Sequence, residues 1–239
     1  MISVIMPAYN KVQNINSAIE DTVNTLGKYG AEYEVIVVDD GSNDGTYDKI
    51  TSTAKEHISV KVCGYKENKG KGYALKHGFQ FAQGNLVLFL DADSDLPPSQ
   101  IPLFLDRMMR NNIDIVIGSK RHPLSEVKYP LLRRFLSRGY SLFITLMFNL
   151  NITDTQVGIK LFRKNILDQI FPKLLVRKFA FDVELLVNAR KLGYHITEMP
   201  VVLNYHHTSR LNLRAIWHIF LDTMAIFYRM KILHYYDRR

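Results

Sequence analysis

The chain of 239 residues contains a single cysteine and no long uninterrupted run of apolar residues. One thiol excludes an internal disulfide bond and any metal site built from several cysteines, which fits a reducing cytosol. A membrane-spanning helix needs about 18–20 mostly apolar residues in a row, and no stretch reaches that length. The first seven residues carry no basic side chain and end on a proline, so we expect no secretory signal. The sequence therefore predicts a protein that is neither exported nor membrane-spanning.

Positive charge is abundant but unevenly distributed, with a formal net charge of +8. Residues 120–138 hold six lysines and arginines against one glutamate, and residues 210–239 hold six against two aspartates. The remainder of the chain is almost neutral. Two basic segments on a neutral body predict a localised anionic partner, for which nucleic acid, acidic lipid headgroups and phosphorylated substrates are all candidates at this point.

The first half of the chain alternates short apolar segments with helical ones. We expect strands at 3–6, 34–38, 60–63, 86–90 and 113–117, and helices near 15–26, 46–56, 73–82 and 100–110. Strands that alternate with helices at this spacing indicate βαβ units and a mostly parallel sheet flanked by helices, an α/β fold.

The second half is more helical and more apolar. We expect helices at 129–150 and 181–191, strands at 158–163 and 196–203, and an amphipathic helix over 213–233. Its apolar stripe consists of Leu213, Trp217, Phe220, Met224 and Phe227. Such a stripe packs against a core or lies in a membrane interface, and separate faces of one helix allow both. We therefore expect a catalytic domain at 1–210 and a basic, amphipathic C-terminal element at 211–239.

Three carboxylates follow the apolar run 86–90, at Asp91, Asp93 and Asp95. Like charges held close together at the end of a buried strand repel one another, and a divalent cation relieves that repulsion. Ligands of open α/β sheets bind at this end of the strands. An acidic loop that caps the next helix is the alternative, because aspartate is common in turns and caps.

Polar residues also follow the other early strands. Pro7-Ala8-Tyr9-Asn10 ends the first strand and Asp39-Asp40-Gly41-Ser42 ends the second, where an acid binds a ribose or a base edge. Residues 68–72 (NKGKG) precede a helix and offer backbone N–H groups and two ammonium charges to a phosphate. Each motif taken alone is also compatible with a simple turn.

In this order and spacing, the motifs resemble those of the family 2 (GT-A) nucleotide-sugar glycosyltransferases over essentially the whole chain. Residues 118–121 (GSKR), 154–162 (DTQVGIKLF) and 181–186 (FDVELL) are similar to the branch that glycosylates polyprenyl phosphates, the dolichyl-phosphate mannose and glucose synthases. The 154–162 segment looks more like the glucosyltransferases. The resemblance implies a GT-A, Rossmann-like mixed sheet. Lys120 stands where the family usually has arginine, so Lys120 or Arg121 takes the phosphate contact.

The resemblance implies a role for each matched residue. Pro7, Tyr9, Asn10, Asp39, Asp40, Lys69, Lys71, Asp91 and Ala92 would bind the nucleotide-sugar. Asp91, Asp93 and Asp95 would hold Mg²⁺ or Mn²⁺. Asp93, Asp154, Lys120, Arg121, Arg134 and Arg210 would serve catalysis, the basic residues by drawing in the acceptor phosphate.

The expected reaction is an inverting transfer of a hexose, glucose rather than mannose, from a UDP- or GDP-sugar to a polyprenyl phosphate. A phosphate monoester has a second pKa of about 6, so it is already a nucleophile at neutral pH. We expect the protein at the cytoplasmic face of a membrane, with or without a membrane subunit, and without nucleic acid. The alternatives are a family 2 enzyme that extends a polysaccharide or glycan, and a non-catalytic protein that binds a membrane surface or nucleic acid.

Overall fold

The computed structural model describes residues 1–93, 95–127, 131–204 and 213–237. A seven-stranded sheet forms its centre, in the order β3-β2-β1-β4-β7-β5-β8. These strands are β1 (Ile2–Ala8), β2 (Tyr33–Asp40), β3 (Val60–Tyr65), β4 (Leu86–Leu90), β5 (Ile115–Ser119), β7 (Ile159–Arg163) and β8 (Ile196–Pro200). The short strands β6 (Glu126–Val127) and β9 (Val202–Leu203) pair separately.

The sheet is mixed and mostly parallel, as the sequence predicts. β1 is parallel to β2 and β4, β2 is parallel to β3, and β5 is parallel to β8. Only β7 among these strands runs antiparallel, between β4 and β5. The carboxyl ends of β1 to β4 therefore meet at one edge, where Ala8, Asp39 and Gly64 lie side by side in register.

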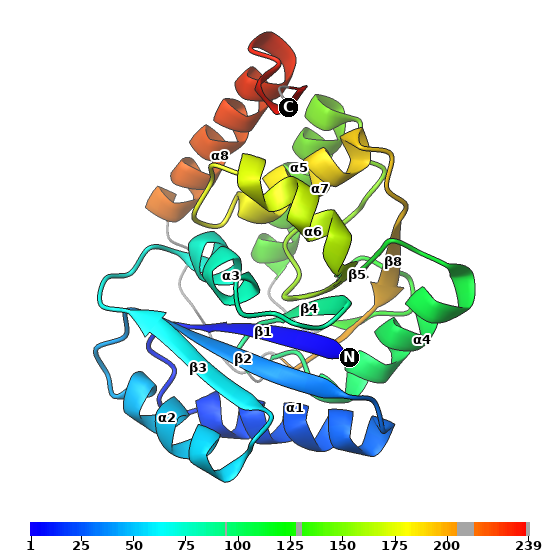
Figure 1. The fold of residues 1–239 in the computed structure, drawn as a ribbon. Coiled ribbons are helices and arrows are strands. Elements are labelled where there is room, and N and C mark those ends of the chain that lie inside the picture. The colour runs from blue at the N-terminus through cyan, green and yellow to red at the C-terminus, as the bar shows by residue number, and fades with distance from the viewer. Residues whose placement is uncertain (94, 128–130, 205–212, 238–239) are drawn as a thin grey trace.

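Helices cover both faces of the sheet (Figure 1). α1 (Ile15–Tyr29), α2 (Thr46–Glu56) and α4 (Ile101–Asn111) pack on one face, and α3 (Lys71–Phe79), α6 (Lys164–Ile170) and α7 (Phe181–Lys191) pack on the other. Strand residues alternate between the two cores: Val35 and Val37 face α1, whereas Ile36 and Val38 face α3. Short turns complete the chain: η1 (Pro98–Gln100), η2 (Phe171–Lys173), η3 (Tyr228–Ile232) and η4 (Tyr235–Asp237).

The predicted strand over 196–203 is two strands rather than one. β8 ends at Pro200, which has no N–H to continue the pairing. Gln100 then accepts a hydrogen bond from the Val202 N–H at 2.7 Å, and the chain turns to pair with β6 instead of β5. Helix α6 lies in a segment where the sequence pattern gave no helix.

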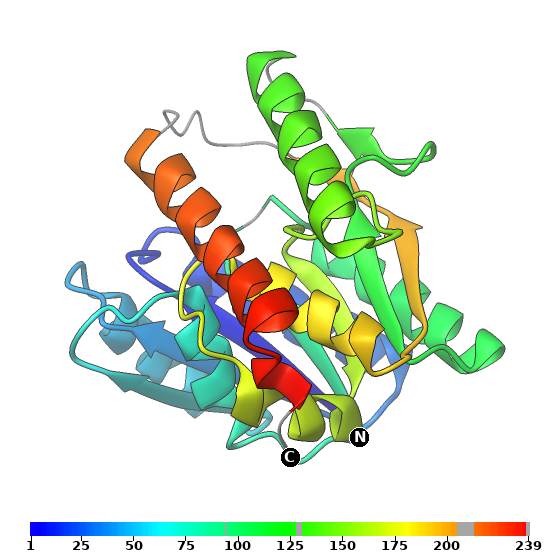
Figure 2. The same cartoon turned by 90° about the horizontal axis from the view of Figure 1, so that it is seen from above.

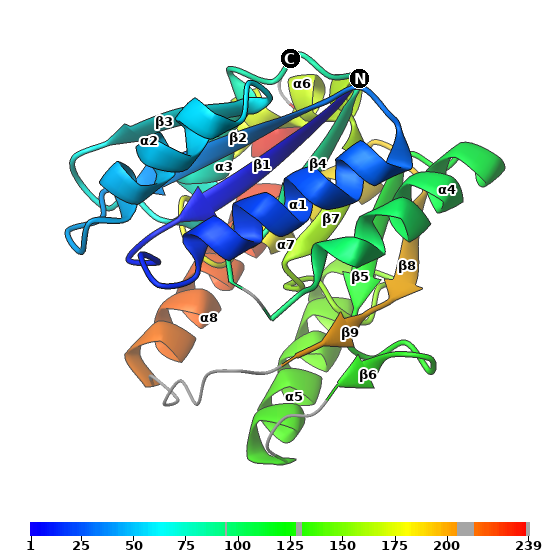
Figure 3. The ribbon, with the colours of Figure 1, turned by 90° about the horizontal axis from the view of Figure 1, so that it is seen from below.

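α5 (Leu131–Phe148) and α8 (Leu213–Phe227) both extend past the edge of the sheet at which β1 ends (Figures 2 and 3). They touch through the Phe143 and Phe220 rings, whose centroids are 5.4 Å apart, and through a 2.9 Å hydrogen bond between the Tyr140 and Thr223 hydroxyls. In the described part of the chain, no helix combines the length and apolar character that crossing a bilayer requires.

The packing of α8 differs from its predicted stripe. Thr223 and Ile226 are fully buried, and Met230 in the following π-helical turn is nearly so. Most of the predicted stripe is exposed, together with its neighbours: Ile216, Trp217, Phe220, Leu221 and Met224, which we call the apolar flank. One face of the helix therefore joins the core, and the flank faces outward, with Phe220 at its border against Phe143 of α5.

Candidate functional site

Two loops at the carboxyl edge of the sheet are joined by reciprocal hydrogen bonds. The Asn10 N–H donates to the Ser42 hydroxyl at 2.9 Å, and the Asn43 N–H donates to Asn10 Oδ1 at 3.1 Å. Asn10 has a left-handed φ of 51°, a conformation that asparagine tolerates well. The loops that follow β1 and β2, with Pro7 and the half-exposed Tyr9, thus form one wall of the predicted nucleotide site.

Asp39 and Asp40 are both buried but have different partners. Both Asp40 oxygens accept hydrogen bonds from the next loop: the Tyr65 hydroxyl at 2.7 Å, the Asn68 side-chain amide at 2.9 Å and the Lys69 N–H at 2.8 Å are among the donors. Asp39 Oδ2 accepts the Ser42 N–H at 3.1 Å, whereas its Oδ1 has no hydrogen-bond partner among the described residues. Asp40 therefore holds the 65–70 loop, and Asp39 retains one buried oxygen without a hydrogen-bond partner among the described residues.

The two lysines of the 68–72 segment point to different surroundings. The Lys69 ammonium lies over two aromatic rings, 5.1 Å from the centroid of Tyr65 and 4.8 Å from that of Tyr73. The Lys71 ammonium instead forms an ion pair with Asp91 at 2.6 Å. Of the two, Lys71 is the one that the fold brings to the acidic cluster.

Asp91 is held at the end of β4 by the segment that precedes β7. Its N–H donates to the Gly158 carbonyl at 3.0 Å. A side chain at Gly158 would place a Cβ 2.3 Å from Asp91 Oδ2, so the carboxylate occupies space that only glycine leaves open. Ala92, which follows, is buried.

The surroundings of Asp93 disfavour the charged form of its carboxylate. Burial raises its pKa to about 6, and the Asp91 and Asp95 carboxylates act in the same direction. Lys11 and Lys71 oppose this effect without cancelling it. The acidic cluster therefore retains the unrelieved repulsion that a cation would remove.

The donor set fits a divalent cation that is shared with a substrate. Within the described residues, no three acidic, histidine or cysteine side chains come close enough to hold an ion by themselves. The assignment of Asp95 as a third ligand stays a prediction. Its backbone carbonyl accepts the Asn204 N–H at 2.8 Å, and its carboxylate adds negative charge near Asp93. Mg²⁺ is usually bound by one or two carboxylates plus substrate phosphates, and Asp91 and Asp93 supply such a pair.

A second ion pair lies at the same edge of the sheet, after the end of β5, which is two strands from β4. The Lys120 ammonium is 3.1 Å from Asp154 Oδ2, and the same oxygen accepts the Lys120 N–H. Burial by itself would raise the pKa of Asp154, but Lys120 and then Arg121 outweigh it and hold that pKa below its usual range. Glu198 accepts the Asp154 N–H at 3.0 Å. Asp154 therefore stays ionised and fixes the Lys120 ammonium.

Arg121 points elsewhere. Its guanidinium donates to the Ser137 carbonyl and to the Ser137 hydroxyl, the latter at 2.7 Å, and so ties the end of β5 to α5. Arg134 is on α5, but its side chain lies outside the described residues, as does all of Arg210.

A buried ion pair, which the sequence motifs do not predict, lies behind the site on β7 and α7. Lys160 on β7 is 1% exposed, and its ammonium lies 2.8 Å from Asp182 Oδ1 of α7, which is 4% exposed. The sequence does contain a signal for this pair: a lysine inside the apolar strand 158–163 and an aspartate inside an apolar helix. Buried charges are normally paired, so two such residues indicate an ion pair.

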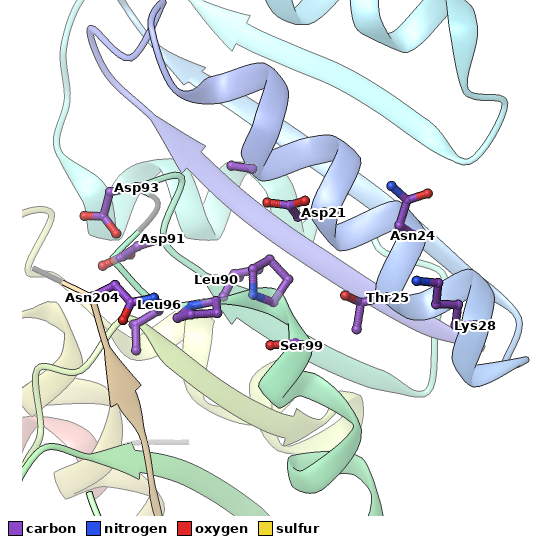
Figure 4. A pocket seen from close by; sticks show the side chains of 13 residues that line it. Asp21, Asn24, Thr25, Lys28, Leu90, Asp91, Asp93, Leu96, Ser99 and Asn204 are labelled. Carbon is purple, nitrogen blue, oxygen red and sulfur yellow. The ribbon is translucent and has the colours of Figure 1, made fainter. Parts of the chain in front are cut away.

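A cleft of about 420 Å³ opens beside the two acids. Figure 4 shows Asp91 and Asp93 at one end, with Asp21, Asn24 and Thr25 on α1 lining the cleft farther along. The acidic pair is therefore accessible from this side of the sheet.

Comparison with known proteins places these features in context. The model of the family described as "Glycosyl transferase family 2" matches residues 3–171. A dolichyl-phosphate beta-glucosyltransferase of Dictyostelium discoideum is 33% identical over 213 residues, which are 84% of this chain and 65% of that protein. One from Trichomonas vaginalis is 32% identical over 249 residues, covering 100% of this chain and 77% of that protein. The Saccharomyces cerevisiae enzyme of the same name is 30% identical over 84% of this chain and 66% of its own length.

Solved structures share the fold. Mannosyl-3-phosphoglycerate synthase from Rubrobacter xylanophilus superposes with a TM-score of 0.74 at 18% identity, covering 98% of this chain and 75% of that one. Glucosyl-3-phosphoglycerate synthase from Mycobacterium tuberculosis in complex with UDP gives a TM-score of 0.73 at 18% identity, covering 95% of this chain and 79% of that one. Another structure of the latter enzyme contains Mn²⁺, UDP and glucosyl-3-phosphoglycerate.

Proposed function

The chain belongs to glycosyl transferase family 2, and we propose that it transfers glucose from UDP-glucose to a polyprenyl phosphate of the dolichyl type, with inversion. The observation that carries this proposal is the likeness, at 30–33% identity, to relatives named dolichyl-phosphate beta-glucosyltransferases. The GT-A-like fold agrees with it.

The donor end of the site consists of acceptors and cations suited to a nucleoside diphosphate. Asp39 Oδ1 offers an unused acceptor to a ribose hydroxyl or a base N–H. Lys71 lies close enough to the acids to reach the diphosphate that leaves. UDP in structures of the same fold favours a uridine nucleotide over the guanosine alternative.

The acceptor end needs charge rather than a general base. A phosphate oxygen of the lipid attacks the anomeric carbon on the face opposite the diphosphate, and the bond from that carbon to the diphosphate oxygen breaks. Because the phosphate is already ionised, no side chain has to remove a proton. The Lys120 ammonium, held by Asp154, neutralises part of the repulsion between the incoming phosphate and the diphosphate.

A divalent cation, Mg²⁺ or Mn²⁺, would be held by Asp91 and Asp93. When bound, it would supply positive charge to the departing diphosphate. The structures of related fold that contain Mn²⁺ with UDP support this assignment.

The function is tested with radiolabelled UDP-glucose, dolichyl phosphate in vesicles, and Mg²⁺ or Mn²⁺. We expect label to enter an organic extract and UDP to be released in equal amount, with both lost when EDTA or lipid without phosphate is used. GDP-mannose is the matched control donor and should give little product. Transfer to a soluble saccharide, with none to lipid phosphate, would instead support the polysaccharide alternative.

We further propose that α8 brings the site to the membrane, as a peripheral contact on the cytoplasmic face. The apolar flank supports this, because Trp217 is 58% exposed and Leu221 is 45% exposed. The core already covers the opposite face of the helix, so the flank is left for another contact. Tryptophan beside aliphatic residues is typical of helices that lie in a bilayer interface.

The flank predicts a specific loss of membrane binding. Replacing Trp217 and Leu221 by serine should reduce vesicle association about tenfold or more, because large apolar groups no longer enter the interface. Flotation with anionic vesicles measures this. The control replaces Leu103 and Met109 of α4 by serine; they are 57% and 65% exposed but lie on the other side of the sheet. Equal flotation of both variants and the unchanged protein would contradict docking through α8.

A further inference from the structure

Four charged side chains alternate in sign from the core outward, and a fifth, Asp93, adds a second negative charge at the end of the row. Lys160 pairs with Asp182 at 2.8 Å, and Lys71 pairs with Asp91 at 2.6 Å. The Asp182 carboxylate acts on Lys71 as well, and Asp93 stands beside Asp91. The ammonium of Lys71 is thus influenced by three carboxylates and is paired with Asp91, one of the two predicted metal ligands.

The inner pair of this row adds little net stability, since taking two charges out of water offsets most of their attraction. Lys160 and Asp182 are almost completely buried, on β7 and α7 respectively. Their effect at the site is to fix a carboxylate behind Lys71 and to balance its charge. Asp182 therefore attracts Lys71 without being free to bind it as a sole partner.

We propose that Lys71 is a positioning residue that holds the place of the divalent cation at Asp91, and that it moves to the diphosphate when the metal-bound nucleotide arrives. The inference rests on the proposed function for the identity of that ligand, a nucleoside diphosphate with its metal. The Lys160–Asp182 pair sets the position from which Lys71 moves.

The geometry of Lys71 permits this exchange. Lys71 is the first residue of α3 and follows Gly70, and its side chain is 22% exposed. Lysine carries a compact charge on a flexible stem, so its ammonium can change partners without a change in the helix. A divalent cation at Asp91 repels the ammonium, while an incoming diphosphate attracts it. Both changes favour the same movement.

The test measures metal binding to the nucleotide-free protein, with Mn²⁺ as the probe and electron paramagnetic resonance of free Mn²⁺ as the readout. Lys71→Met removes the competing charge, and we expect Mn²⁺ to bind about tenfold more tightly than to the unchanged protein. Lys71→Gln should behave in the same way and serves as a second neutral variant. Lys71→Arg keeps the charge and should bind Mn²⁺ as weakly as the unchanged protein.

Lys66→Met is the matched control, because Lys66 is an exposed lysine shortly before the same helix. It removes one charge from the protein as a whole and should leave Mn²⁺ binding unchanged. Unchanged or weaker Mn²⁺ binding in both neutral Lys71 variants overturns the proposal. A gain in Lys66→Met equal to that of Lys71→Met overturns it too, because the effect would then come from net charge.

UDP binding in EDTA, measured by calorimetry, gives the second half of the test. Lys71→Met should bind UDP about tenfold more weakly, since its ammonium is no longer available to the diphosphate. A single substitution that strengthens metal binding and weakens UDP binding is not expected from a merely structural lysine. UDP binding that is unaffected overturns the movement to the diphosphate. Neither measurement uses glucosyl transfer, so failure of the proposed function remains distinguishable from failure of this inference.

Discussion

Asp93→Asn is expected to lower glucosyl transfer at least about a hundredfold while making the metal-free protein more stable. The loss follows because Asp93 is one of the two carboxylates that would hold the metal beside the diphosphate. The gain in stability follows because the charged form of Asp93 is unfavourable in the folded protein. Burial and the neighbouring acids raise the pKa of Asp93 from 3.8 to about 6. An amide of nearly equal shape removes that unfavourable charge.

The pH dependence of this stability difference has a definite sign. The folded state holds the proton of Asp93 more tightly than the unfolded state does. Ionisation of Asp93 therefore lowers the free energy of unfolding as the pH rises from about 4 to 6. The advantage of Asp93→Asn should therefore be full above pH 6 and vanish below pH 4. Thermal unfolding in EDTA at pH 7.5 and pH 4 measures it.

Asp168→Asn is the control for this prediction, because Asp168 forms an exposed ion pair with Lys164 one helical turn away. Such pairs contribute little, so both stability and transfer should change only slightly. Asp93→Asn protein that melts lower than the unchanged protein at pH 7.5, or that transfers glucose at a normal rate, would contradict the role given to this carboxylate.

Much of the sheet, and the gathering of the polar motifs at one of its edges, was predictable from local sequence. Strand β4 and helices α2 and α7 begin and end where the apolar pattern places them. The polar motifs after β1, β2 and β4 lie close together because parallel strands have their carboxyl ends at one edge of the sheet. Their order in the sequence is therefore enough to predict that they are neighbours in space.

The position of β7 was not predictable in this way. Its insertion between β4 and β5 brings Lys160 beside Phe89 of β4 and sends its side chain toward α7. Long-range packing decides which strands pair, and a five-residue apolar pattern carries no information about it. The Lys160–Asp182 pair, and the dependence of Asp91 on Gly158, follow only from that pairing.

Helix α8 shows a different limit. Apolar residues occur on most of its surface, so several stripes satisfy a helical period equally well. Thr223 and Ile226, outside the predicted stripe, are the fully buried residues, and Phe220 and Phe227 of that stripe contact α5 at its border. Periodicity finds the helix, but only the neighbouring elements decide which face is buried.

The motif at 118–121 does not decide which of Lys120 and Arg121 meets the acceptor phosphate, and the contacts favour Lys120. Its ammonium has one carboxylate partner and a side chain that is 20% exposed. Nη2 of Arg121 donates to Ser137 of α5, and its Nη1 is buried and has no hydrogen-bond partner among the described residues. The Lys120 side chain is thus open to a ligand, whereas the Arg121 guanidinium is turned inward and holds the helix.

Lys120→Met is expected to raise the KM for polyprenyl phosphate about ten- to a hundredfold, the range for losing a hydrogen bond to a charged group. The KM for UDP-glucose should change little, because Lys120 lies at the acceptor end of the site. Asp154 keeps backbone donors at Lys120 and Gln156, so the variant should fold normally. Lys120→Arg restores a cation and should recover most of the affinity for the lipid phosphate.

Arg121→Met supplies the opposite pattern and thereby tests the division of roles. Loss of its two contacts with Ser137 should lower the melting temperature, with a smaller effect on the KM for the lipid. Steady-state kinetics with each substrate varied in turn, beside thermal unfolding of both variants, separates the two residues. If Arg121→Met alone raised the KM for the lipid phosphate, and Lys120→Met only the KM for UDP-glucose, the acceptor phosphate would have to be assigned to Arg121.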